Sequence, residues 1–283
     1  MQKYFKKIVI GLFLILFAVG IYAVCIEPFR LVITNWTVET PKWQDNPPLK
    51  IVLIADTHAK FPSMTEAHIE SIVERANAQN PDLILLLGDY VATHPFGLAL
   101  TPEEGTSPYK KLKAPCGVFA IVGNHDLHPE EQEIGWVDAL AATGIPVLRN
   151  DTRRLTCEGK TFWIAGMDEW RMGHPDMSKT LQKITDQDPV IMMTHDPDAF
   201  AYMSARVALT VAGHTHGGQI LIPFYGPVPF VIPSKFGLRY VYGHIQEEGK
   251  YLVVTSGLGM TGIPARFLRP PEIAVVTLKS PEK

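Results

Sequence analysis

Cysteine is scarce in this chain: Cys25, Cys116 and Cys157 are the three among 283 residues. So few cysteines do not indicate the disulfide framework of a small secreted scaffold. We expect Cys116 and Cys157 to be small buried side chains near strands, although a bridge between them stays open. The chain also lacks a stripe of lysines and arginines, and its formal net charge is −3. This composition gives no support for binding to nucleic acid.

Charge is absent from one long segment, Ile8–Ile26, which follows Lys3, Lys6 and Lys7. As a helix, its nineteen residues would be about 28 Å long, close to the ~30 Å hydrocarbon core of a bilayer. Tyr22–Cys25 is a poor cleavage site, so an uncleaved anchor is favoured over a removed signal. The lysines then place the remainder of the chain on the outer face of the cell membrane. A shallow, monotopic insertion that leaves the chain cytoplasmic stays open.

The sequence predicts three parts: an anchor over residues 1–26, a linker over 27–48 and one domain over 49–283. The linker contains four prolines and no sustained period, so it is a stalk or an edge strand. In the domain, short apolar runs alternate with amphipathic segments, the pattern of a layered α/β fold. We expect strands near 51–55, 83–87, 118–122, 147–148, 154–157, 162–165, 190–193, 207–212, 251–255 and 273–278. We expect helices after a capping box of Ser63 and Glu66, from Pro129 to before Gly144, and near 177–184.

Polar clusters end five of these strands. They are Asp56-Thr57-His58, Gly88-Asp89, Gly123-Asn124-His125-Asp126, His195 and Gly213-His214-Thr215-His216. Each alone is a weak signal, since a lone histidine or a Gly-Asp pair is more often structural. Together they should converge, because the carboxyl ends of strands in an α/β sheet border the ligand-binding crevice. Asp, His and Asn suit divalent transition metals, and two adjacent ions hydrolyse phosphate esters.

The order D-x-H, GD, GNH-D, H and GH-x-H resembles the calcineurin-like metallophosphoesterases, over residues 49 to about 279. Leu87–Val91, Gly213–Gln219 and Pro264–Arg266 resemble its membrane-anchored bacterial branch, which includes the UDP-2,3-diacylglucosamine hydrolases of lipid A biosynthesis. The resemblance implies an α/β fold, a four-layer α-β-β-α sandwich, behind an N-terminal transmembrane helix. It also implies two divalent metal ions, which could be Mn²⁺, Fe or Zn²⁺.

The family pattern also implies roles for single residues. It assigns Asp56, His58 and His216 to one metal and Asn124, His195 and His214 to the other, with Asp89 bridging both. A hydroxide shared by the metals would attack phosphorus. His125 would protonate the leaving group or clamp a phosphate oxygen, or else make a supporting hydrogen bond. Arg266 is a candidate substrate clamp because of its planar guanidinium, with a surface ion pair as the alternative.

Ala92 marks a departure from part of the family. Protein phosphatases of this superfamily have GD-x-V-D, whose second aspartate orients the histidine that corresponds to His125. Here that dyad is absent or is rebuilt with Asp126, which argues against protein phosphatase activity.

A proline-rich apolar segment, Ile220–Tyr242, follows the last ligands and should overhang the site. It is either packed core or a surface for an acyl chain or bilayer, and with an anchor present we favour lipid contact.

The leading hypothesis is a membrane-anchored phosphodiesterase or pyrophosphatase for an amphipathic substrate. The resemblance makes UDP-2,3-diacylglucosamine the candidate. That nucleotide lipid is cytosolic, however, so an outward-facing domain would instead meet envelope phospholipids or cell-wall phosphodiesters. Two alternatives remain. One is a phosphodiesterase for soluble substrates that the anchor merely localises, and the other is a non-catalytic, metal-binding membrane adaptor.

Overall fold

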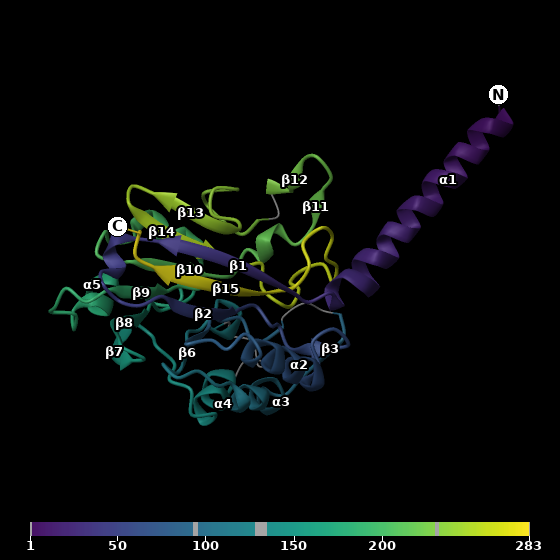
Figure 1. Ribbon diagram of the computed structural model, residues 1–283. Helices are drawn as coiled ribbons and strands as arrows, with labels where there is room; N and C mark the ends of the chain where they lie inside the picture. The colour runs from purple at the N-terminus through teal and green to yellow at the C-terminus, as the bar shows by residue number, and fades with distance from the viewer. Residues whose placement is uncertain (1, 93–95, 128–134, 230–231, 283) are drawn as a thin grey trace.

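Two mixed β-sheets pack face to face in the computed structural model, which describes residues 2–92, 96–127, 135–229 and 232–282 (Figure 1). The first sheet has the order β1 (Val32–Glu39), β15 (Glu272–Lys279), β2 (Leu49–Ile54), β4 (Leu83–Leu86), β6 (Val118–Ala120). The second has the order β13 (Gly243–Glu247), β14 (Lys250–Val254), β10 (Leu209–Ala212), β9 (Val190–Met193), β8 (Lys160–Gly166), β7 (Asp151–Cys157). Two small antiparallel pairs complete the strands: β3 (Lys60–Phe61) pairs with the distant β5 (Leu98–Ala99), and β11 (Leu221–Ile222) forms a hairpin with β12 (Gly226–Pro227). The α/β class expected from the sequence is confirmed.

Burial on both faces explains why the central strands are continuously apolar. In β2, Ile51 and Leu53 enter the core between the two sheets, whereas Val52 and Ile54 face the helices outside the first sheet. This division follows from the alternation of side chains along a strand. The same alternation holds in β9, where Ile191 lies between the sheets.

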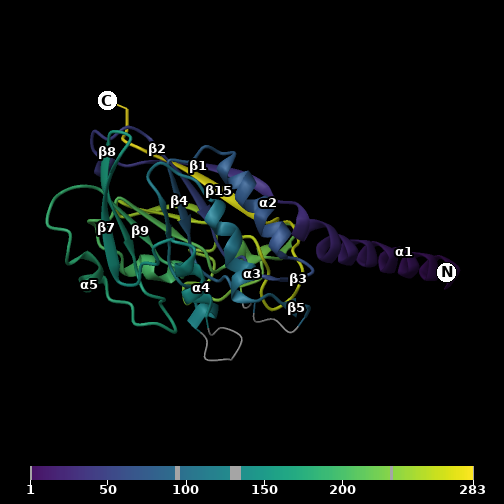
Figure 2. The same ribbon diagram turned by 90° about the horizontal axis from the view of Figure 1, so that it is seen from below.

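The outer face of the first sheet is covered by α2 (Glu66–Asn77), α3 (Pro102–Thr106) and α4 (Trp136–Ala142) (Figure 2). The helix expected after Ser63 is α2, and its apolar face (Ile69, Ile72, Val73 and Ala76) is buried; its N-cap, however, is Thr65, which accepts the His68 N–H at 3.2 Å, and not Ser63. Part of the helix expected after Pro129 lies outside the described residues. Over the second sheet, the described chain supplies α5 (Met177–Leu181) and a 3₁₀ segment, Pro197–Tyr202. That helical layer is thinner than the first.

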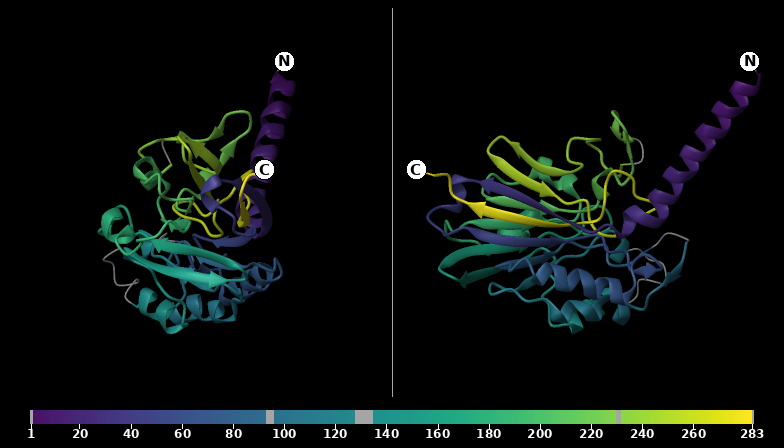
Figure 3. Two further views of the ribbon diagram at one scale, coloured as in Figure 1. Left: turned by 60° about the vertical axis from the view of Figure 1, so that its left-hand side comes forward. Right: turned by 45° about the vertical axis from the view of Figure 1, so that its right-hand side comes forward.

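An apolar helix, α1 (Gln2–Ile21), projects away from the sheets (Figure 3). None of its residues is buried, and the helical stretch Gln2–Phe29 to which it belongs is long and apolar enough for a membrane span or a signal sequence. The turns after it contact the 266–269 segment. Ala23 O accepts the Arg266 N–H at 2.9 Å, and the Glu27 carboxylate accepts the N–H groups of Leu268 and Arg269 at 2.9 and 2.6 Å. The chain then enters β1, an edge strand parallel to β15, so the edge-strand alternative for part of the linker holds.

Cys116 and Cys157 form a disulfide with a Cα–Cα distance of 5.4 Å. The expectation of two separate buried thiols is therefore wrong. The bond joins the segment before β6, in the first sheet, to the end of β7, in the second sheet. Cys25 is free and exposed.

Removal of this disulfide should lower the free energy of unfolding. The bridged residues are 41 positions apart, and closing a loop of that size restricts the unfolded chain by about 4 kcal/mol. We expect that loss in the double variant Cys116→Ala/Cys157→Ala, measured by urea unfolding in a Cys25→Ser background. Reductant should destabilise the parent to the same level and leave the variant unchanged. Equal stability of oxidised parent and variant would contradict the prediction.

Candidate metal centre

The five polar clusters meet at one end of the molecule, and the reason lies in strand direction. In the first sheet β2, β4 and β6 are parallel, and in the second β9 and β10 are parallel. The carboxyl ends of strands from both sheets border the site, rather than those of one open sheet. Among the described residues, potential ligand atoms lie within 4.8 Å of one another in three groups: Asp56, His58, His216; Asp89, His195, His214; and His58, Asp89, His125.

In the first group, two imidazole nitrogens face each other. His58 Nε2 lies 3.2 Å from His216 Nε2, which lies 3.8 Å from Asp56 Oδ1. His58 Nδ1 lies 2.8 Å from Val91 O. A carbonyl accepts only from an N–H, so the proton is on Nδ1 and the Nε2 lone pair is directed at the site.

The second group is held in the same way. His195 Nδ1 donates to Leu87 O at 2.7 Å, which directs its Nε2 towards His214 Nδ1, 3.1 Å away. The other nitrogen of His214 donates to Pro233 O at 3.1 Å. Asp89 Oδ2 lies 3.0 Å from His195 Nε2 and 3.7 Å from His58 Nε2. This carboxylate therefore stands between the two groups, where a bridging ligand is needed.

These positions fit two divalent cations. Two nitrogens bound to one ion at ~2.1 Å lie roughly 3.0–3.4 Å apart, and both histidine pairs have that spacing. Asn124 Oδ1 is buried and accepts no hydrogen bond from the described residues. A buried amide oxygen without a donor is costly unless a cation binds it. The donor set, imidazole with carboxylate and amide oxygen, suits Mn²⁺, Fe or Zn²⁺ without selecting one.

The protonation of the site agrees with metal binding. Burial lowers the pKa of His58 to about 3 and holds the pKa values of His214 and His216 well below their usual range. These imidazoles are therefore neutral at pH 7 and can donate lone pairs. Burial also opposes charge on Asp89 and His195, but their contact lowers the pKa of Asp89 and raises that of His195 to about 10.

The backbone of the ligand loops is unusual. Five candidate ligands have positive φ, a region that costs non-glycine residues free energy and that clusters at functional sites: Asp56 (54°), His58 (44°), Asp89 (57°), His214 (71°) and His216 (51°). Glycine is required beside them. A Cβ on Gly123 would lie 2.1 Å from Asp89 Oδ1, and one on Gly213 would lie 2.6 Å from Asp56 Oδ2. Because they have no side chain, the glycines of the GNH and GH-x-H motifs leave room for the carboxylates of Asp89 and Asp56.

Asp126 does not rebuild a dyad with His125 through its carboxylate. That carboxylate accepts the N–H groups of Asp89 and Gly123, both at 2.8 Å, and of Tyr90 at 2.8 Å. It thereby ties the loop after β4 to the loop after β6. His125 donates its backbone N–H to Asp89 Oδ1 at 2.9 Å, and its ring centroid lies 5.0 Å from that of His58. The histidine is thus held beside the ligands by backbone contacts.

The prediction that Arg266 clamps substrate is corrected by its burial. Its side chain is fully buried and donates to the carbonyls of Ser256, Gly259 and Arg269 at 2.6–3.0 Å. It shapes the loop behind His216 and does not line the cavity.

The cationic residue at the cavity that the sequence patterns did not indicate is Arg171. Among the described residues that line the cavity, it alone has a permanent positive charge, and its Nε donates to Asp196 at 2.6 Å.

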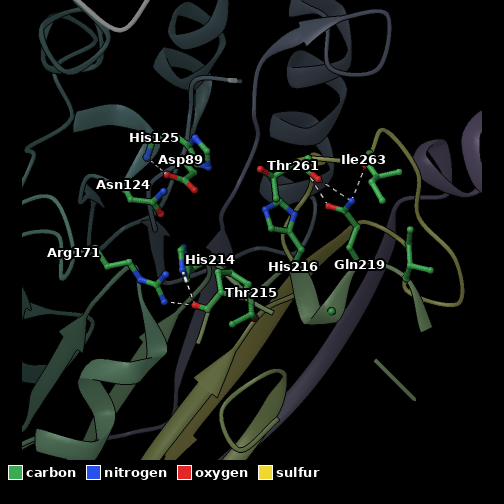
Figure 4. Close-up of a pocket in the computed structure, with 14 residues that line it drawn as sticks. Asp89, Asn124, His125, Arg171, His214, Thr215, His216, Gln219, Thr261 and Ile263 are labelled. Carbon is green, nitrogen blue, oxygen red and sulfur yellow. Dashed lines mark hydrogen bonds between the residues drawn. The ribbon is translucent and has the colours of Figure 1, made fainter. Parts of the chain in front are cut away.

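Several of the candidate metal ligands, together with His125 and Arg171, line a cavity of about 380 Å³ (Figure 4). Asp89, Asn124 and His125 line one side, and Gln219, Thr261 and Ile263 line the other. His214 and His216 lie between the two sides. The cavity thus extends from the candidate metal ligands to an apolar margin at Ile263, which is 60% exposed.

The segment Ile220–Tyr242 has two halves that differ in burial. In the first, Ile222, Phe224 and Tyr225 are exposed around the β11–β12 hairpin. In the second, Tyr240 is buried and Phe236 packs against the second sheet's outer core. Phe230 lies outside the described residues.

Comparisons with known proteins give independent information. The family profile described as calcineurin-like phosphoesterase matches residues 49–218. An uncharacterized metallophosphoesterase, YkuE of Bacillus subtilis (strain 168), is 35% identical, covering 92% of this chain and 89% of its own. A Danio rerio "transmembrane protein with metallophosphoesterase domain" is 32% identical, covering 82% of this chain and 53% of its own. The solved structure of a dimetal phosphatase from Danio rerio has a TM-score of 0.45 at 10% identity, covering 76% of this chain and 89% of that chain.

Proposed function

This chain belongs to the calcineurin-like phosphoesterases and is a metal-dependent phosphoester hydrolase. On this basis, we propose that its substrate is an amphipathic phosphodiester or diphosphate at a membrane surface. The observation that carries the proposal is the extent of the cavity. One end contains the candidate ligands, and the other reaches Ile220 and Ile263. Such a cavity offers polar contacts to a phosphoryl group and apolar contacts to the rest of the molecule.

We assign the first metal to Asp56, His58 and His216 and the second to Asn124, His195 and His214, with Asp89 between them. The distances within the histidine pairs and the unpaired Asn124 oxygen support this assignment. When bound, a pair of divalent ions supplies Lewis acidity towards the phosphoryl oxygens and activates water.

The chain's other residues then act on substrate. His125 lines the cavity beside Asp89 and is placed to give a proton to the leaving oxygen. Arg171, in place of Arg266, is placed to contact a phosphate oxygen, and its ion pair with buried Asp196 holds the guanidinium at the cavity wall. Asp126 keeps the two loops that present Asp89, Asn124 and His125 in register.

We further propose that residues 1–26 are a retained membrane anchor and that the catalytic domain, expected over 49–283, also includes β1 from the 27–48 segment. The hydrogen bond between the Arg266 N–H and Ala23 O supports retention, because cleavage at any position after Ala23 would remove it. Lys3, Lys6 and Lys7 favour a cytoplasmic N-terminus. The Cys116–Cys157 disulfide supports the same orientation, because disulfides persist in oxidising compartments outside the cytoplasm.

This orientation bears on the substrate. UDP-2,3-diacylglucosamine, the candidate from motif resemblance, is a cytosolic nucleotide lipid and would lie on the opposite side of the membrane. A lipid phosphoester of the outer leaflet or cell envelope satisfies the same cavity without that conflict. We therefore favour an envelope lipid phosphoester.

A pair of matched substrates tests the proposal. Two phosphatidyl-p-nitrophenols with the same leaving group, one with short and one with long acyl chains, are compared with bis-p-nitrophenyl phosphate. Each buried methylene contributes about 0.8 kcal/mol, so two extra methylenes in contact with the protein should raise kcat/KM about 15-fold. Equal kcat/KM for the three would instead indicate a soluble substrate. Hydrolysis of bis-p-nitrophenyl phosphate without hydrolysis of either lipid would also count against an amphipathic substrate.

A further inference from the structure

Exposed apolar side chains gather beside the base of α1. We call this set the rim: Phe29 next to the helix; Ile222, Phe224 and Tyr225 in the β11–β12 hairpin; and Ile263 and Leu268 in the loop after β14. Phe224 is fully exposed and Tyr225 is 65% exposed. Large apolar side chains that cluster on a surface mark an interaction site rather than scattered exposure.

The rim is joined to α1 by a continuous set of hydrogen bonds. The loop segment 266–269 bonds to Ala23 and Glu27, as described above. The same segment bonds to the hairpin, because Leu221 N–H donates to Phe267 O at 2.9 Å and Phe267 N–H donates to Gln219 O at 3.1 Å. Rings of Tyr22 and Phe267 also meet edge to face at 6.2 Å. The hairpin therefore has a fixed position relative to α1.

The direction in which the β11–β12 hairpin points also favours contact with a membrane that contains α1. The β11–β12 hairpin projects from the sheets to the same side as α1, and it does so in the views of Figure 1 and of Figure 3. The opposite end of the sheets, with the chain's C-terminus, points away from α1. A bilayer that contains α1 would therefore meet the hairpin before any other part of the described domain.

The rim is also continuous with the catalytic cavity. Gln219 follows the ligand His216 closely in the chain, and its side-chain amide donates to Thr261 O at 3.1 Å and Ile263 O at 2.8 Å. Ile263 belongs both to the cavity lining and to the rim. The short path from the metal ligands to the membrane side thus consists of ordered, hydrogen-bonded chain.

We propose that the rim is a bilayer-docking surface: Phe224, Tyr225 and Ile263 enter the headgroup region of the leaflet next to the domain, and the cavity opens onto that leaflet. The proposal commits to a lipid surface because the rim adjoins a helix with the length and composition of a membrane span. Aromatic and aliphatic side chains at such a position partition ~5–10 Å into the headgroup boundary. The inference rests on the proposed anchor and deepens the proposed function, since substrate would enter from the membrane.

Depth-dependent quenching tests the docking directly. The full chain, in a Cys25→Ser background, is reconstituted in phosphatidylcholine–phosphatidylglycerol vesicles with or without lipid doxyl-labelled at acyl carbon 5. A single nitrobenzoxadiazole label is placed through Phe224→Cys or Ile263→Cys. The matched surface control is Glu248→Cys, in the turn between β13 and β14 at the far end of the second sheet, where the side chain is 86% exposed. Phe13→Cys, within α1, is the positive control.

We expect blue-shifted emission and quenching by about half or more at positions 224 and 263, a depth typical of interfacial insertion, and neither effect at 248. Labels at 224 and 263 that behave like 248 while 13 is quenched would overturn the docking surface. An unquenched label at 13 would overturn the anchor and the rim together. Quenching does not depend on hydrolysis. A docked rim without any acyl-chain preference would therefore refute the proposed substrate class alone.

Discussion

Replacement of Asp89 by Asn is expected to abolish phosphoester hydrolysis and to leave the fold intact. Asp89 Oδ2 lies 3.0 Å from His195 Nε2 and 3.7 Å from His58 Nε2, so its carboxylate is the negative charge shared by both ligand groups. The amide keeps the size of the side chain but removes that charge. We expect kcat/KM to fall on the order of 10³-fold or more, because the transition-state charge loses its main electrostatic support.

Metal analysis accompanies the kinetics. Asp89→Asn and His214→Ala should each contain less bound metal than the parent, with unchanged far-ultraviolet circular dichroism. The matched control is Asp138→Asn, which alters an exposed aspartate in α4 and should preserve both activity and metal content. An Asp89→Asn variant with near-parental turnover would count heavily against a dinuclear centre.

Replacement of His125 by Gln should affect substrates according to their leaving groups. An alkoxide must be protonated as it departs, whereas p-nitrophenolate leaves without a proton. A general acid contributes roughly 10²–10⁴-fold. We therefore expect a loss of that size in kcat for an alkyl phosphodiester and a much smaller loss for bis-p-nitrophenyl phosphate.

The same comparison separates two roles for His125. Its ring also belongs to a potential ligand group with His58 and Asp89. If it bound a metal ion, His125→Gln would lose metal and would slow both substrates equally. Parental metal content with a leaving-group-dependent loss supports the proton donor. Asn124→Ala provides the matched comparison for a neighbouring residue that we assign to the metal.

Much of the fold could be predicted from local pattern. The strand Val190–Met193 was predicted at its observed bounds, because buried strands give continuous apolar runs that end abruptly at polar residues. Edge strands give weaker patterns: β13 (Gly243–Glu247) mixes polar and apolar residues and was not expected. The α2 cap shows a subtler limit, since Ser63 and Thr65 both offer a hydroxyl near the helix start and only geometry distinguishes them.

The candidate site was predictable as a set of residues but not in its supporting contacts. The clusters converge because each follows a strand end, which the sequence reveals. Burial is not visible in that pattern, so Arg266 was expected at the substrate and Arg171 was overlooked. The Cys116–Cys157 pairing likewise depends on how two sheets face each other, and sequence alone does not fix connectivity.

The hydrogen bonds of Ala23 and Glu27 to the 266–269 segment have a kinetic consequence. A catalytic unit on a flexible tether samples a volume of solution, whereas one fixed to its anchor cannot tumble independently of it. With α1 in a bilayer, encounters with lipid would occur by lateral diffusion in two dimensions. Turnover would then follow the mole fraction of substrate in the membrane and not its bulk concentration.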